Sequence, residues 1–80
     1  MKVLVKCFSQ VKYAVGTSKL ALDMDPGSTT ADLETMIREK AAGELDGVTL
    51  RTAVNKHYVS EPVPLEDGDE VAFIPPVQGG

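Results

Sequence analysis

The chain has 80 residues, 42% of them hydrophobic, which is enough for one small domain with a thin core. Its formal net charge of −4 argues against nucleic acid and anionic membranes as partners, because both are bound through clustered Lys and Arg. The single cysteine excludes an internal disulfide, and no apolar run is long enough to span a bilayer. We therefore expect a cytoplasmic protein without a signal peptide.

The first quarter of the chain has the pattern of two strands. Apolar residues alternate over residues 3–8 and again over residues 20–24, which is the period of a strand. Residues 15–18 break this pattern, and the Pro-Gly pair within residues 25–28 predicts a turn. Both faces of the first strand carry apolar side chains, which indicates that both faces are covered, one of them by a partner.

One helix follows the second strand. Thr29 suits the position before the helix, and Asp32 three residues later completes a pair resembling a capping box. Gly43 is suited to end the helix. The helical period places four apolar residues on a single stripe, namely Leu33, Met36, Ile37 and Ala41.

The second half of the chain predicts three further strands. Residues 48–54 form the first, residues 55–56 a turn, and residues 57–59 a short returning strand. Residues 65–69 contain Gly68 and read as a turn, and residues 71–74 alternate as the last strand.

This order of elements predicts an α+β fold. A mixed, mostly antiparallel sheet with one main helix packed on one face buries the most apolar surface for so short a chain. That arrangement is the ubiquitin-like β-grasp, in which the first and last strands lie side by side at the centre. We expect residues 1–75 to form the β-grasp domain and residues 76–80 an extended, flexible carboxyl-terminal tail.

The tail is the most unusual stretch of the sequence. Pro75 and Pro76 end the last strand because neither can donate a backbone hydrogen bond. A Gly-Gly end has almost no side-chain bulk, so it can enter a narrow channel in another protein, and an extended tail would reach roughly 20 Å. The alternatives are a frayed terminus or an expression scar. We expect Gly80 to be the natural end, and the segment that passes through the channel to be Pro76, Val77, Gln78 and Gly79.

No catalytic or metal-binding pattern is present in the sequence. One histidine and one cysteine cannot build a zinc site, so we expect no metal. We expect His57 to be a solvated loop residue and Cys7 a buried, inert thiol on a strand face. The acidic residues 66–70 lack the spacing of a calcium loop and are expected to form a solvated turn, or else a contact for a basic partner.

The strand pattern also predicts a partner interface. Phe8 and Ile74 should point to the sheet face opposite Val5 and Phe73, and Tyr58 would join them in an apolar patch beside the tail. The alternative is that loops cover these three residues.

Three stretches of the sequence carry a resemblance to a known family. Residues 67–80 read DGDEVAFIPPVQGG, residues 8–11 read FSQV and residues 53–55 read AVN. Together they resemble the MoaD family, the small subunits of molybdopterin synthase, over nearly the whole chain. Three positions depart from the family. Lys12 and Tyr13 stand where the family often has Arg-Glu, and Ser9 stands where Ala is usual.

The resemblance implies a sulfur carrier that is not an enzyme on its own and binds no cofactor itself. An activating enzyme would use ATP and Mg²⁺ to adenylate the Gly80 carboxylate, and a sulfur donor protein would convert it to a thiocarboxylate. The large synthase subunit would then receive the tail, and the sulfur would pass to cyclic pyranopterin monophosphate to build the molybdopterin dithiolene. The family implies a heterotetramer of two small and two large subunits.

Three other functions remain open from the residues. The chain could carry sulfur to the thiazole of thiamine or to a thiolated tRNA base. It could be a ubiquitin-like modifier that forms isopeptide bonds to lysines. It could also be a plain interaction module whose Gly-Gly end has no role.

Overall fold

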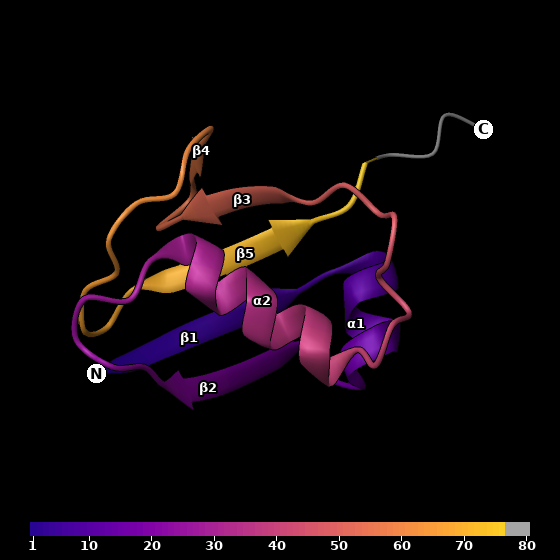
Figure 1. Cartoon of the computed structure of the whole chain (residues 1–80), viewed down its shortest axis with the longest axis horizontal. Helices are drawn as coiled ribbons and strands as arrows, with labels where there is room; N and C mark the ends of the chain where they lie inside the picture. The colour runs from indigo at the N-terminus through magenta and orange to yellow at the C-terminus, as the bar shows by residue number, and fades with distance from the viewer. Residues whose placement is uncertain (77–80) are drawn as a thin grey trace.

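Five strands form one sheet in the order β2-β1-β5-β3-β4 (Figure 1). The computed structural model describes residues 1–76 of the chain. In chain order the elements are β1 (Lys2–Cys7), α1 (Ser9–Val15), β2 (Lys19–Asp23), α2 (Thr30–Lys40), β3 (Arg51–Val54), β4 (His57–Val59) and β5 (Glu70–Ile74).

The first and last strands lie side by side at the centre of the sheet, as predicted. They run parallel, with Val5 beside Val71 and Cys7 beside Phe73. The other strand pairs are antiparallel, so the sheet is mixed. With α2 lying across the sheet, this is the predicted β-grasp fold (Figure 1).

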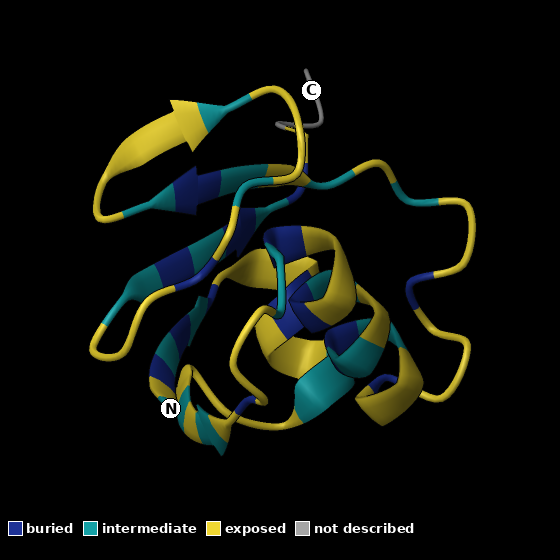
Figure 2. Ribbon diagram, turned by 60° about the vertical axis from the view of Figure 1, so that its left-hand side comes forward, coloured by how far each residue is buried: buried dark blue, intermediate teal, exposed yellow. Residues whose placement is uncertain are grey.

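The core lies between α2 and one face of the sheet (Figure 2). Leu33 and Ile37 of α2 are fully buried, as are Val5, Val71 and Phe73 of the two central strands. Burying such side chains supplies about 1.5–3 kcal/mol each, which is the main driving force for folding a chain of this size.

The predicted capping box at the start of α2 is present. The Thr29 hydroxyl accepts a hydrogen bond from the backbone N–H of Asp32, and an Asp32 carboxylate oxygen accepts one from the backbone N–H of Thr29 at 2.8 Å. Two N–H groups without intrahelical partners are thereby satisfied. The helix ends at Lys40, and the expected stop at Gly43 lies in the turns that follow it.

A second helix, α1, was not predicted. It has seven residues and buries a single side chain, Val11, so its sequence shows no apolar stripe. The Phe8 side chain forms no capping hydrogen bond, so the usual start signal is missing too. Gly16 ends α1 in a left-handed conformation, with φ of 92°. The break expected at residues 15–18 is therefore the end of a helix.

Two strand boundaries also differ from the prediction. β1 ends at Cys7, so Phe8 lies outside it, although its backbone is still extended. β3 begins at Arg51, and the preceding residues 48–50 follow a loop held by Arg38. The Arg38 guanidinium donates hydrogen bonds to the carbonyl oxygens of Leu45 at 2.7 Å and Val48 at 2.8 Å.

The last strand leads directly to the tail. Ile74 is half-buried, Pro75 is buried and Pro76 is exposed. The expected tail residues Val77, Gln78, Gly79 and Gly80 lie outside the described residues.

Candidate functional site

The face of the sheet opposite α2, which we call the outer face, carries the predicted interface residues. Strand pairing aligns Ile74 with Arg51 and Ala72 with Ala53, and paired residues point to the same side of a sheet. Val71 and Phe73 alternate with them and point into the core. The prediction that Ile74 and Phe73 point to opposite faces is therefore confirmed.

Phe8, Tyr58 and Ile74 come together around one hollow on the outer face, of about 270 Å³, which we call the outer hollow. The side chains of Phe8 and Tyr58 are accessible, at 45% and 55% exposure, so loops of the described chain do not cover them. The sequence predicted these three residues but not the others that line the hollow, which are Lys6, Ala53, Lys56, Glu70 and Ala72.

These further residues could have been found from the strand period. Ala72 and Glu70 precede Ile74 by two and four residues, so they share its face. The residues of β3 and β4 could not be assigned in the same way, because the register between strands is set by the folded turns and not by the local pattern.

Side chains of the outer face contact one another through a cation–π contact and an ion pair. The guanidinium carbon of Arg51 lies 4.0 Å from the centroid of the Tyr58 ring, a cation–π contact. The Lys6 ammonium lies 3.5 Å from a carboxylate oxygen of Glu70, and both side chains are about one-third exposed. The Tyr58 ring is thus held in place by its neighbour while remaining exposed.

The tail begins at this site. Ile74 lines the outer hollow and is the last residue of β5, so the chain leaves the sheet beside the hollow. The proposed tail positions Val77, Gln78, Gly79 and Gly80 are not among the described residues, so their predicted roles remain predictions.

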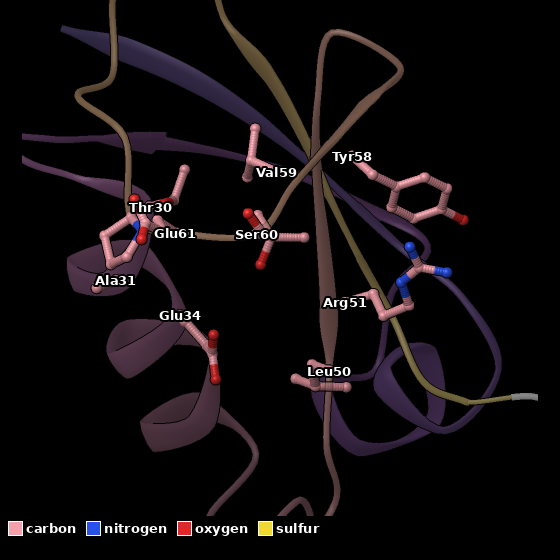
Figure 3. Close-up of a pocket in the computed structure, with 11 residues that line it drawn as sticks. Thr30, Ala31, Glu34, Leu50, Arg51, Tyr58, Val59, Ser60 and Glu61 are labelled. Carbon is pink, nitrogen blue, oxygen red and sulfur yellow. The ribbon is translucent and has the colours of Figure 1, made fainter.

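A second hollow, of about 450 Å³, lies between α2 and the β3–β4 hairpin (Figure 3). Two of its polar groups are engaged: the Thr30 hydroxyl accepts a hydrogen bond from the Val63 N–H, and the Glu34 carboxylate lies 2.9 Å from Arg38. Arg51 and Tyr58 also line this hollow. In Figure 3 their side chains lie on the other side of β3 from Glu34, toward the outer face. No nucleophile and base are paired among the labelled side chains.

Cys7 and His57 line neither hollow. Cys7 is 2% exposed, and burial raises the pKa of its thiol because the thiolate is poorly solvated there. His57 is exposed in β4. Within residues 1–76, no three His, Cys, Asp or Glu side chains are grouped to hold a metal ion, and no helix is long and apolar enough to cross a membrane.

The sequence matches a known family over almost its whole length. The sequence profile of the ThiS family matches residues 5–80. The chain is 40% identical to the molybdopterin synthase sulfur carrier subunit of Escherichia coli, over 98% of this chain and 99% of that protein.

The fold is also similar to those of two solved structures. The putative molybdopterin converting factor subunit 1 of Pyrococcus furiosus superposes with a TM-score of 0.85 at 28% identity, covering 96% of this chain and 99% of that one. A chain in the complex of subunits 1 and 2 of the Helicobacter pylori molybdopterin-converting factor has a TM-score of 0.71 at 28% identity, with full coverage of both chains.

Proposed function

This chain belongs to the ThiS family, and on that premise we propose that it is the sulfur carrier subunit of a molybdopterin synthase. The observation that carries the proposal is the 40% identity to a protein of that name over almost the whole of both chains. The outer hollow beside the start of the tail supports it, because a carrier needs a docking surface next to its reactive end.

The chemistry is confined to one carboxylate. A carboxylate is a poor electrophile, because its charge is delocalised and oxide is not a leaving group. We propose that a Gly80 carboxylate oxygen attacks the α-phosphorus of ATP on the activating enzyme, so that pyrophosphate leaves and an acyl-adenylate forms, with Mg²⁺ neutralising the phosphate charge. Sulfide supplied by a donor protein then displaces AMP and leaves a thiocarboxylate on Gly80.

Delivery depends on the ordered part of the chain. Phe8, Tyr58 and Ile74 would dock against the large synthase subunit, and Gly79 would let the tail pass through a narrow channel. The thiocarboxylate sulfur would then attack cyclic pyranopterin monophosphate, and water would hydrolyse the resulting thioester, leaving the sulfur on the pterin and restoring the Gly80 carboxylate. Two such transfers would build the dithiolene. The solved complex of subunits 1 and 2 from H. pylori supports a large-subunit partner.

Catalytic side chains would belong to the partners in this scheme. The chain is then the non-catalytic subunit of a cytoplasmic heterotetramer with two copies of each subunit. Its own contribution is to bind, to orient the tail and to carry the sulfur. Arg51 contacts the Tyr58 ring and Pro75 is buried, and we expect these two features to serve the first two of these tasks.

Reconstitution tests the proposal. The thiocarboxylated chain is mixed with the large subunit and cyclic pyranopterin monophosphate, and dithiolene formation is followed by mass spectrometry of the pterin. We expect product in proportion to carrier consumed, and none with a control chain that lacks Gly79 and Gly80. If sulfur instead reaches only a thiazole precursor or a tRNA in parallel reactions, the assignment to molybdopterin is wrong.

A further inference from the structure

The formal charge of the outer face is opposite in sign to that of the rest of the chain. Strand pairing and the lining of the outer hollow assign to the outer face five of the eight basic residues and two of the twelve acidic residues. The outer face therefore carries a formal charge of +3, while the remainder of the chain carries −7. The basic residues are Lys2, Lys6, Lys19, Arg51 and Lys56, and the acidic residues are Asp23 and Glu70.

Two of the five cations are neutralised by neighbours on the same face. Lys2 lies 3.1 Å from a carboxylate oxygen of Asp23, and Lys6 is paired with Glu70. Within residues 1–76, the other three form no ion pair shorter than 4.0 Å. The uncompensated charge of the outer face therefore belongs to three residues, namely Lys19, Arg51 and Lys56.

Lys56 occupies a backbone position that favours glycine. Asn55 and Lys56 form the two-residue turn between β3 and β4, with φ of 49° and 72°. Two-residue turns with positive φ at both positions strongly prefer Gly at the second, because a Cβ atom there costs about 1 kcal/mol. Lys56 also lines the outer hollow, so a residue with an unfavourable backbone conformation lies at this surface.

We propose that the outer face docks an apolar protrusion bordered by carboxylates, with Lys56 and Arg51 facing those carboxylates. This rests on the proposed function and names the chemistry of the large-subunit surface that covers the outer hollow. The net charge of −4 would instead favour a basic partner. The formal charge of the residues assigned to the outer face has the opposite sign, and complementary charge accelerates association.

A protein partner fits these observations better than nucleic acid. Lys56 lines the hollow that Phe8, Tyr58 and Ile74 also line, and Arg51 lies against the Tyr58 ring. An apolar centre with charged groups at its border is typical of a protein interface. Nucleic acid binding depends on contacts to many phosphates, for which three cations are few.

A pair of matched variants tests the proposal. Lys56→Gln and Lys40→Gln remove the same charge, one from the outer hollow and one from the end of α2 on the other side of the molecule. Association with the large subunit is measured by stopped-flow fluorescence at low and high ionic strength. We expect Lys56→Gln to slow association about three- to fivefold at low salt, a difference that fades at high salt. We expect Lys40→Gln to remain within about 1.5-fold of the parent chain.

Lys56→Gly separates the backbone effect from the charge effect. This variant relieves the positive φ, so its thermal midpoint should rise, while its association should slow as much as that of Lys56→Gln. A more stable but slower-binding variant cannot be explained by damage to the fold.

Two results would overturn the inference. One is equal association rates for Lys56→Gln and Lys40→Gln at low salt, and the other is retention of the free chain by a short DNA duplex at physiological salt. If the parent chain does not bind the large subunit at all, the proposed function fails and the inference fails with it. If the parent chain binds and delivers sulfur but the two variants are alike, only the charge assignment is wrong.

Discussion

The guanidinium carbon of Arg51 lies 4.0 Å from the centroid of the Tyr58 ring, on the face of the sheet that α2 leaves open. A large aromatic side chain that is 55% exposed is therefore held by a neighbouring cation. Holding a side chain before binding lowers the entropy lost when a partner covers it. The outer hollow is therefore the surface at which substitutions test partner binding.

Tyr58→Ala should weaken binding to the large subunit by about tenfold or more, because aromatic anchors dominate interface energies. Phe8→Ala and Ile74→Ala should weaken it as well. Isothermal titration calorimetry measures the affinity, and circular dichroism checks that the fold is intact. Tyr13→Ala is the matched control, since Tyr13 is 82% exposed on α1 and does not line the outer hollow. Unchanged affinity for all three interface variants would exclude this docking surface.

Arg38→Lys should lower the free energy of unfolding by about 1.5–3 kcal/mol. A lysine keeps the charge but cannot reach both the Leu45 and Val48 carbonyl oxygens, which the Arg38 guanidinium joins. Urea unfolding measures the change. Glu34→Gln removes only the partly exposed ion pair with Arg38 and should cost less than about 1 kcal/mol. Equal losses in the two variants would show that the ion pair, and not the loop contact, is the stabilising element.

The stability of the protein should fall at alkaline pH, in part through Cys7. Burial raises the folded-state pKa of the Cys7 thiol above its ordinary value of 9.0. As the pH rises through that ordinary value, the Cys7 thiol loses its proton in the unfolded chain before it does so in the folded chain. The free energy of unfolding therefore falls as the pH rises from that ordinary value to the folded-state pKa. Chemical denaturation from neutral pH to about pH 10 should show a shallower decline for Cys7→Val than for the parent chain. Parallel curves would contradict the assignment.

One added residue after Gly80 should abolish sulfur transfer without changing the fold. The proposed reaction requires the carboxylate to belong to Gly80, and an alanine there would place a Cβ-bearing residue at the end of the channel. The reconstituted synthase reaction measures the loss, and the thermal midpoint of the extended chain should equal that of the parent. The same alanine added before Met1 serves as the control. Substantial product from the extended chain would show that the end of the tail is not the reacting group.

Much of the fold could be predicted from the sequence because its strands and main helix have strong local patterns. The alternation of Val3, Val5 and Cys7 predicted β1, and the Thr29–Asp32 pair predicted where α2 begins. The helix α1 could not be predicted in this way. Its seven residues bury only Val11, and its position is fixed by contact with α2 and the central strands rather than by its own pattern.

The candidate site could be predicted only in part, because some of its contacts depend on how the strands pair. The face to which Ile74 points follows from strand alternation, and Phe8 continues that alternation past the end of β1. The approach of Arg51 to Tyr58, and of Lys56 to the outer hollow, depends on the register of β3, β4 and β5. Register is a property of the assembled sheet, so the charge of the outer face emerged only from the folded structure.

The most direct test is the intact mass of the chain after incubation with the activating enzyme, ATP, Mg²⁺ and a sulfur donor. We expect a mass increase equal to the exchange of one oxygen for sulfur, with fragment ions placing it on Gly80. We expect no increase when ATP is omitted. An unchanged mass, or a whole sulfur atom added to Cys7, would contradict the claim that this protein carries sulfur on its terminal carboxylate.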